Sequence, residues 1–367
     1  MTLIAHIDSE TGFSGGEVQV FLLIEALAKR GYENALVCPP GSRSEEEARS
    51  RSLRSFGVRL RNDLDFVSVF RLASWLRKSG AALVHLHTGR ATWLGGLAAR
   101  LAGVPAITTR RMDRRVSRGM RTKLMYGSLV QRTVAISPAV RDCLLEANVA
   151  ADSIELIWDA VDPDGFEPSA ARAATRSELG IAENEFVMIS MAALVKRKGI
   201  DVLIDAAALL VNRDVPVRVL IGGEGEERVA LEEQAKRLGV EAQVSFLGWR
   251  SDKANLLAAA DVFVLPSRAE GVGVAALEAM AAGKAVVASR VGGLSQAVVD
   301  GETGSLVEAG NAAALAEALE KLAGDSAMRD SLGKRGRERV LELFSIESQA
   351  SQYIETYNRV LTMKGTS

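Results

Sequence analysis

Short apolar runs alternate along the whole chain with longer segments in which apolar residues recur every three or four positions. The runs are typical of buried strands, and the longer segments are typical of amphipathic helices. In the first half the strand-like runs are TLIAHID, NALVCPP, ALVHLH, AITT and TVAIS, and in the second half they are FVMISMA, VRVLIGG, VSFLGW, DVFVLPS and AVVAS. This alternation predicts parallel sheets covered by helices, and therefore an α/β fold.

The chain of 367 residues is long enough for roughly two domains. The periodicity is interrupted at WDAVDPDGFEPSAARAA, residues 158–174, where prolines and glycine break both patterns. We therefore predict two Rossmann-like, doubly wound domains, an N-terminal one over residues 1–165 and a C-terminal one over residues 166–345. The last periodic segment, within residues 346–367, carries an apolar stripe that we expect to pack on a neighbouring element.

The composition is that of an ordinary globular protein, with 48% hydrophobic residues, 25% charged residues and a formal net charge of −1. This balance gives no reason to expect a nucleic acid partner. The two cysteines, Cys38 and Cys143, lie in no metal-binding pattern, so we expect neither a structural metal nor another cofactor. The N-terminal stretch lacks the pattern of a signal peptide, and we predict a cytoplasmic protein.

The segment EGVGVAALEA, residues 270–279, combines two carboxylates with two glycines. Gly271 and Gly273 allow a tight turn, and the residues from near Val274 onward favour a helix. A helix N-terminus suits a phosphate group, whereas carboxylates bind hydroxyl groups. Glu270 and Glu278 therefore predict a ligand with hydroxyl groups on both sides of a phosphate, which is the chemistry of a nucleotide sugar.

Other candidate residues follow strands of the second half, because ligands of such sheets bind beyond the carboxyl ends of the strands. Lys198, in VKRKG, is the predicted ligand of the diphosphate. Gly222 and Gly223, in GGEGEE, either line the nucleotide crevice or serve the local turn.

In the first half, Gly15 and Gly16 follow the first strand and precede a helix, so they form either a flexible loop or a second turn that approaches an anion. His6 and His85 lie within apolar strands and are expected to be core histidines. His87 lies at a strand end, where a core role and a role on the acceptor side are both open.

The basic segment around residues 110–124 has apolar residues at every fourth position. It is either a solvated helix face or a surface that contacts an anionic membrane or a phosphorylated, lipid-linked acceptor.

Taken together, these segments resemble the retaining glycosyltransferases of family four, the group 1 transferases of the GT-B type. The resemblance extends over almost the whole chain, and its most specific part is PSRAEGVGVAALEAMAAGKAVVASRVGGLSQAVVDGETGSLV. It implies a donor site mainly in the C-terminal domain, an acceptor site mainly in the N-terminal domain, and a final helix that crosses back to the N-terminal domain. It also implies transfer with retention of anomeric configuration, usually without a metal.

Carried over residue by residue, the resemblance assigns Lys198 to the diphosphate and Glu278 to the ribose. Glu270 is assigned to the donor sugar, and Gly15 and Gly16 are assigned to a loop that closes over the donor. The backbone expected at the donor sugar and phosphate is that of Gly271, Val272, Gly273 and Val274.

Two departures from the family pattern concern positive charge. Many relatives have Gly-Arg-Leu before the lysine, where this chain has Ala192-Ala193-Leu194. Many also have a histidine where this chain has Arg111. We hypothesise that Arg111, or its neighbour Arg110 on the acceptor side, restores the missing charge.

The sequence thus favours a hexosyl or related transferase that uses a nucleoside diphosphate sugar. The expected acceptor is a cell-envelope glycan or glycolipid such as a lipopolysaccharide core, and the enzyme is expected to be cytoplasmic or peripheral to the membrane. Two alternatives are a sugar-nucleotide epimerase of the same fold and a non-catalytic nucleotide-sugar-binding protein.

Overall fold

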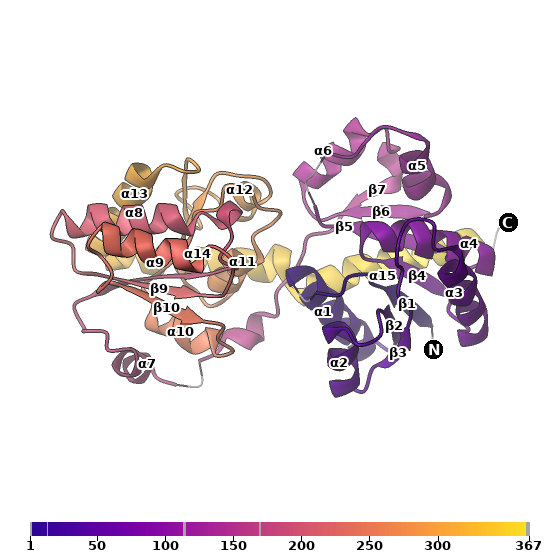
Figure 1. Ribbon diagram of the computed structural model, residues 1–367, viewed down its shortest axis with the longest axis horizontal. Coiled ribbons are helices and arrows are strands. Elements are labelled where there is room, and N and C mark those ends of the chain that lie inside the picture. The colour runs from indigo at the N-terminus through magenta and orange to yellow at the C-terminus, as the bar shows by residue number, and fades with distance from the viewer. Residues whose placement is uncertain (1, 13, 113–114, 169, 365–367) are drawn as a thin grey trace. The chain divides into compact units, whose positions relative to one another are not determined.

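The computed structural model describes residues 2–12, 14–112, 115–168 and 170–364. The chain divides into two compact units (Figure 1). Unit 1 contains residues 1–159 and 346–367, and unit 2 contains residues 160–345. Each unit is a parallel sheet flanked by helices.

Unit 1 contains a seven-stranded sheet in the order β3-β2-β1-β4-β5-β6-β7. Its strands are β1 (Leu3–Ile7), β2 (Glu33–Cys38), β3 (Arg54–Gly57), β4 (Leu83–Leu86), β5 (Ala106–Arg110), β6 (Arg132–Ala135) and β7 (Ile154–Leu156). Its α-helices are α1 (Gly15–Lys29), α2 (Arg43–Ser50), α3 (Phe66–Ser79), α4 (Gly96–Ala102), α5 (Met120–Lys123), α6 (Pro138–Glu146) and α15 (Ile346–Lys364).

Unit 2 contains a six-stranded sheet in the order β10-β9-β8-β11-β12-β13. Its strands are β8 (Phe186–Met191), β9 (Val217–Gly222), β10 (Val244–Gly248), β11 (Val262–Leu265), β12 (Ala285–Ser289) and β13 (Ser305–Val307). Its α-helices are α7 (Arg172–Glu178), α8 (Ile200–Val211), α9 (Arg228–Arg237), α10 (Lys253–Ala259), α11 (Val274–Ala281), α12 (Leu294–Ala297), α13 (Ala312–Gly324) and α14 (Ser326–Arg339).

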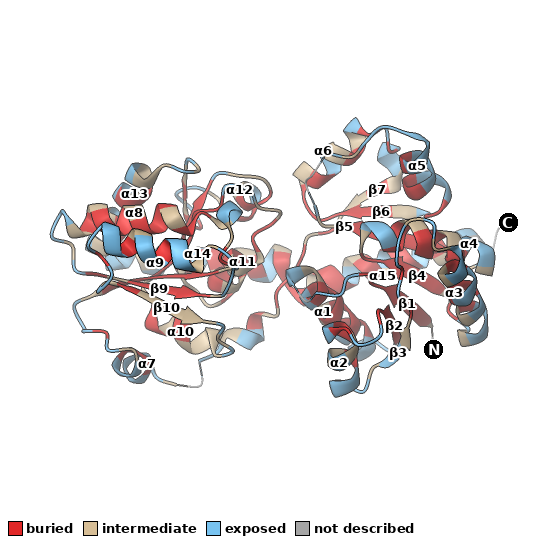
Figure 2. Cartoon of the chain, in the orientation of Figure 1, coloured by how far each residue is buried: buried red, intermediate tan, exposed pale blue. Residues whose placement is uncertain are grey.

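The central strands of both sheets are buried along their whole length (Figure 2), because helices cover both faces. This explains why the strands read as continuous apolar runs in the sequence. The strand order reverses between β1 and β4 in unit 1 and between β8 and β11 in unit 2. Sheets of this kind place their ligands beyond the carboxyl ends of the two strands at such a reversal.

The predicted α/β class with two doubly wound parallel sheets is confirmed, and every predicted strand-like run contains a strand. The pattern missed the short strands β3, β7 and β13 at the sheet edges. Edge strands bury less of their surface, so their sequences carry a weaker apolar signal.

The first segment of unit 1 ends at Asp159, earlier than the boundary predicted at residue 165. The short 3-10 turn η4 (Pro163–Phe166) contacts α10 and α11, and it therefore belongs to unit 2. Chain composition marks a break in periodicity but does not show with which side the broken segment packs.

The final helix α15 packs in unit 1, where it contacts α1. Tyr353 and Tyr357 are fully buried. The Tyr353 hydroxyl lies 2.9 Å from Thr109 Oγ1, and the Tyr357 hydroxyl lies 2.8 Å from His85 Nδ1. The last helix is therefore part of the core of the first unit.

Candidate functional site

Lys198 and Glu270 form an ion pair although they belong to different loops of unit 2. Lys198 ends the turn η5 (Lys196–Lys198) after β8, and Glu270 lies in the loop after β11. These strands are neighbours at the reversal of the strand order, which brings the two loops together. Only 12% of the Lys198 side chain and 11% of the Glu270 side chain are exposed. The Ser267 hydroxyl also donates to Glu270 Oε2, at 3.1 Å, so this carboxylate has two donors.

Gly199 allows the two loops to lie against each other. Its φ is 66°, and a Cβ at this position would lie 2.0 Å from the carbonyl oxygen of Pro266. The Arg268 N–H donates to the carbonyl of Arg197 at 2.7 Å, and the Arg268 guanidinium donates to both carboxylate oxygens of Asp201 at 2.7 and 2.6 Å. Lys198 is therefore held on a fixed backbone.

The glycine turn between the two glutamates leads into α11 at Val274, as the sequence predicted. Gly273 has a φ of 79°, and a Cβ there would lie 2.6 Å from Leu294 Cδ1. Val272 is buried, so the turn that includes Gly271 is anchored in the core. This geometry presents the start of a helix, where backbone N–H groups and the helix dipole favour an anion.

Glu278 on α11 pairs with Lys253, the first residue of α10. The ammonium group of Lys253 lies 2.9 Å from both carboxylate oxygens. The lysine side chain is 45% exposed and the glutamate side chain only 13%, so the carboxylate is fixed while its partner can move into solvent. Both glutamates therefore have a lysine partner, each from the loop of a different strand.

Gly223, which follows the last residue of β9, is required by close backbone packing, whereas a Cβ at Gly222 would come nearest to the Met191 side chain, at 3.3 Å. Gly223 has a φ of 129°, and a Cβ there would lie 2.0 Å from the carbonyl oxygen of Ala192. The Gly223 N–H donates to the carbonyl of Gly248 at 2.7 Å, and the Ala192 N–H donates to that of Gly222 at 3.0 Å. The local turn thus has a structural reason, and a role in lining the nucleotide site stays a prediction.

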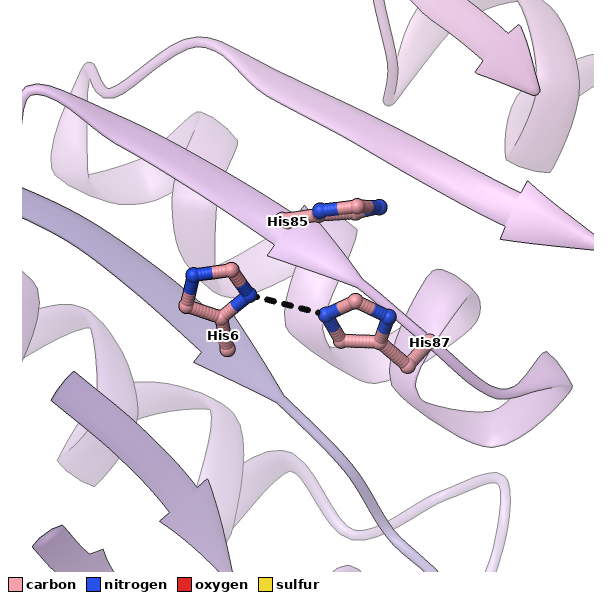
Figure 3. Close-up of side chains that lie close together, drawn as sticks. All are labelled: His6, His85 and His87. Atoms are coloured by element: carbon pink, nitrogen blue, oxygen red, sulfur yellow. Dashed lines mark hydrogen bonds between the residues drawn. The ribbon is translucent and has the colours of Figure 1, made fainter. Parts of the chain in front are cut away.

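Histidines from β1 and from the end of β4 lie together in unit 1 (Figure 3). His6 Nδ1 and His87 Nε2 are 3.0 Å apart, and His6 Nε2 lies 3.1 Å from Asn34 Oδ1. The Asn34 amide nitrogen donates to the carbonyl oxygens of Ile24 and Tyr32, so its oxygen accepts from His6. His6 therefore carries its proton on Nε2, and its Nδ1 accepts from the Nε2–H of His87.

Arg111 continues this chain of hydrogen bonds. Its Nη1 lies 3.4 Å from His87 Nδ1, and its Nε donates to Asp159 Oδ1 at 3.1 Å. Burial is the largest single influence and would lower the pKa of Arg111, but the charge and hydrogen bond of Asp159, together with Tyr353 and Asp8, outweigh it and the pKa is raised. Burial lowers the pKa of His6 to about 4 and that of His87 well below its ordinary value. Arg111 is therefore the cation of this network, and both imidazoles are neutral.

The ligand atoms of His6, His85 and His87 lie within 4.8 Å of one another, which is close enough to consider a metal site. His85 bonds to Tyr357 through Nδ1 and to Thr109 Oγ1 through Nε2 at 2.7 Å. Each ring nitrogen of the three histidines thus has a hydrogen-bond partner. A cation would have to break these bonds beside Arg111, and we interpret the cluster as a hydrogen-bonded core. His6 and His85 are fully buried, as predicted for core histidines.

Arg110, the last residue of β5, is half-buried, and its Nη1 donates to the Tyr126 hydroxyl at 3.3 Å. Gly15 and Gly16 lie in the first turn of α1 and not in the loop before it, contrary to the expectation. The Ser14 side chain caps α1, and Glu17 completes a capping box. The helix therefore begins at Gly15, earlier in the chain than expected.

Sequence reasoning missed three charged residues that the fold brings to these places. Lys253 follows β10, Asp159 follows β7, and Asp8 follows β1. Burial raises the pKa of Asp8 to about 6, although the N–H of Glu10 donates to its carboxylate. Their positions shortly after strands were the available signal, because the sequence pattern identified the runs VSFLGW and TLIAHID but did not single out Lys253 or Asp8.

Two family models match almost the whole chain. The model described as "Glycosyltransferase Family 4" matches residues 13–164, and the model described as "Glycosyl transferases group 1" matches residues 171–339. An alpha-maltose-1-phosphate synthase of Mycobacterium tuberculosis is 30% identical over 310 residues, which cover 77% of this chain and 80% of the relative. The chain belongs to the group 1 glycosyltransferases.

Another relative, the lipopolysaccharide core biosynthesis glycosyltransferase LpsE of Rhizobium meliloti, is 38% identical over 183 residues, which cover 50% of this chain and 53% of the relative. The chain spans about half the length of several curated relatives that it matches. The crystal structure of HepE from Anabaena, in complex with UDP and glucose, superposes with a TM-score of 0.86 at 22% identity. The superposition covers 98% of this chain and 100% of HepE, and it shows a shared GT-B fold.

Proposed function

We propose that this chain is a retaining glycosyltransferase that moves a sugar, a hexose or a related one, from a nucleoside diphosphate sugar to a glycan or glycolipid of the cell envelope. The observation that carries the proposal is the arrangement of Glu270 and Glu278 on either side of the glycine turn that starts α11, each paired with its own lysine. Family membership and the name of the LpsE relative support the choice of reaction and of a lipopolysaccharide core as acceptor.

In this proposal the diphosphate lies at the start of α11 and accepts hydrogen bonds from Lys198 and from backbone N–H groups. Glu278 accepts hydrogen bonds from the ribose hydroxyls, and Glu270 accepts them from the donor sugar. Breaking the bond between the sugar and the phosphate oxygen develops negative charge on the diphosphate. A preformed positive environment stabilises that charge and lowers the barrier.

Retention follows if the acceptor hydroxyl attacks the anomeric carbon from the face that the diphosphate leaves. The acceptor oxygen forms the new bond, the bond to the phosphate oxygen breaks, and the acceptor proton passes to the departing phosphate. This sequence needs neither a covalent nucleophile nor a metal. Glu270 then acts by positioning the donor sugar and Lys198 by stabilising the leaving group.

Arg111 has a further proposed role, as the cation that replaces the positive charges missing from the family pattern. Its burial beside Asp159 gives it a fixed place in unit 1 and an undiminished charge at neutral pH. His87 and Arg110 remain proposed residues of the acceptor side.

A thermal-shift panel of nucleoside diphosphates and their sugars tests the proposal, because a ligand that binds only the folded state raises the melting temperature. We expect the nucleotides of one base to raise the melting temperature of the protein. This rise should be lost in Glu278→Ala. If no nucleotide or nucleotide sugar stabilises the protein, the proposed donor site is wrong.

Product analysis then separates the possible reactions. A transferase releases nucleoside diphosphate only when an acceptor is present, whereas an epimerase interconverts the donor sugar without any acceptor. Tight donor binding with no turnover over a panel of envelope glycans would instead indicate a binding protein.

A peripheral place on the inner face of the membrane fits an acceptor that is linked to lipid. Within the described part of the chain, every helix is too short or too polar to cross a bilayer. Contact with an anionic membrane through the basic segment 110–124 is part of the proposal. Asp113 and Arg114 of that segment lie outside the described residues.

A further inference from the structure

Four large apolar side chains at the start of α3 point into solvent. Leu64 and Val67 are 75% and 80% exposed, and Phe66 and Phe70 are 49% and 66% exposed. The opposite side of α3 is packed into the core of unit 1 through Val69, Leu72, Ala73 and Leu76. Figure 2 shows the outer side of the helix as exposed.

These exposed side chains do not contribute to the core of unit 1, so folding does not explain why they are apolar. A surface helix of a globular protein normally has one apolar face toward the core and a polar face toward water. The start of α3 instead carries apolar residues on both faces, and a contiguous exposed apolar patch marks an interaction surface. We call Leu64, Phe66, Val67 and Phe70 the α3 patch.

The α3 patch is joined to the basic segment that contains α5. Arg121 Nη1 lies 2.7 Å from Asp63 Oδ2, next to Leu64 in the chain. The Arg121 guanidinium also lies 5.4 Å from the centre of the Trp93 ring, and Trp93 Nε1 donates to the carbonyl of Asp63 at 2.9 Å. Met120, beside Arg121, is 75% exposed and adds another apolar side chain at this junction.

Exposed basic residues accompany the apolar side chains in both segments. The exposed basic residues of the two segments include Arg59, Arg61, Arg71, Arg115, Arg118 and Lys123. The nearby carboxylates are already engaged, since Asp63 pairs with Arg121 and Asp65 accepts from the N–H of Ser68 as the cap of α3.

We propose that the α3 patch inserts into the headgroup region of an anionic lipid bilayer while the surrounding arginines and lysine bind lipid phosphates. Exposed aromatic and aliphatic side chains within a basic surface have the chemistry of peripheral membrane binding. A second copy of the chain is the less suitable occupant, because a two-fold dimer would place this basic surface against itself. The proposal goes beyond the basic segment of the proposed function by making α3 the inserted element.

The inference rests on the proposed function only in that a lipid-linked acceptor explains why the chain would bind a membrane. Vesicle binding and nucleotide binding can be measured separately, so the two proposals can fail independently. If no nucleotide stabilises the protein but vesicles bind it, the donor site fails and the membrane surface stands.

The test is co-sedimentation of the full chain with vesicles of phosphatidylcholine alone or mixed equally with phosphatidylglycerol. We expect binding to the mixed vesicles only, and we expect V67S/F70S to bind them roughly tenfold or more weakly, because it removes two apolar anchors. R61Q/K123Q should lower binding by roughly fivefold for each charge removed, and added salt should reduce the binding of the parent protein.

The control is V229S, which replaces another exposed valine, 65% exposed, on α9 of unit 2, and which should bind as the parent does. A cooperative thermal unfolding transition of V67S/F70S, measured without any ligand, would show that the variant is folded. The proposal is overturned if the parent does not bind anionic vesicles or if V67S/F70S binds them equally well. A parent dimer that V67S/F70S converts to a monomer would also overturn it, and would assign the patch to a second copy.

Discussion

The ammonium group of Lys198 donates a hydrogen bond to Glu270 Oε2, so the residue proposed for the phosphate and the residue proposed for the donor sugar neutralise each other. Both side chains are almost fully buried, so water cannot readily replace either partner. A donor that enters between them must therefore give Lys198 a new anion and Glu270 new hydroxyl donors. A diphosphate linked to a sugar offers both groups in one molecule.

The two glutamates should differ in their effect on nucleotide binding. Glu278→Ala removes the proposed ribose contact and should weaken nucleoside diphosphate binding by about tenfold or more. Glu270→Ala should change that affinity by less than about threefold and lower turnover instead. Calorimetric titration with the nucleotide, followed by steady-state kinetics, measures both effects. Equal losses of nucleotide affinity would contradict the division of roles.

Arg111 should contribute to turnover as well as to the stability of the fold. Arg111→Ala leaves the buried Asp159 carboxylate without its partner, and we expect a loss of about 3–5 kcal/mol in unfolding free energy. R111Q/D159N removes both charges and should be destabilised less, which makes it the variant for kinetics. If Arg111 stabilises the leaving diphosphate, this double variant loses about a hundredfold in kcat. A folded double variant with unchanged turnover would rule out the catalytic role.

Asp8 should make the stability depend on pH. Its pKa is raised from 3.8 to about 6 in the folded state, so the folded protein binds this proton more tightly than the unfolded chain does. Above pH 6 the buried carboxylate is charged and destabilises the folded protein fully. This destabilisation decreases as the carboxylate binds a proton between pH 6 and pH 4. Asp8→Asn should therefore raise the unfolding free energy at about pH 8 by up to about 3 kcal/mol.

That advantage of Asp8→Asn should shrink below pH 6 and vanish near pH 4, as urea unfolding at a series of pH values will show. Asp164→Asn removes an exposed carboxylate and serves as the control. An advantage of Asp8→Asn that is independent of pH would show that the gain has another origin.

Gly199→Ala should disturb both the fold and the donor site. Alanine at a positive φ costs about 1–2 kcal/mol by itself. At Gly199 the new Cβ would also meet the Pro266 carbonyl, so we expect about 1–3 kcal/mol more and weaker nucleotide binding through displaced Lys198. Gly180→Ala is the matched control, because Gly180 has a φ of 65° and no atom within 4 Å of its Cβ position. Equal destabilisation by the two substitutions would contradict this account of the loops.

The sequence was sufficient to predict the fold class, the central strands and the helix start at Val274. These features depend on local signals, namely apolar runs, glycines at turns and helix-forming residues. The strand pattern also placed Lys198 and Glu270 after strands of one sheet, but the order of those strands, which makes the loops neighbours, is a property of the whole fold.

The partners of the candidate residues could not be predicted, because they come from distant parts of the chain. Nothing in the sequence near Glu278 indicates Lys253, and nothing near Arg111 indicates Asp159. The direction of hydrogen bonding through His6 depends on the way in which Asn34 is held by carbonyl groups of another segment. Gly15 and Gly16 were misplaced because the capping box at Ser14 competes with the flexibility that two adjacent glycines suggest.

The return of α15 to unit 1 has a consequence for the order in which the chain can fold during synthesis. Unit 2 is one uninterrupted stretch, so all its strands and helices are synthesised before α15. Unit 1 begins first but lacks Tyr353 and Tyr357 until the end, and with them the partners of Thr109 and His85. Of the two units, the one whose strands are made first is therefore the last to be completed.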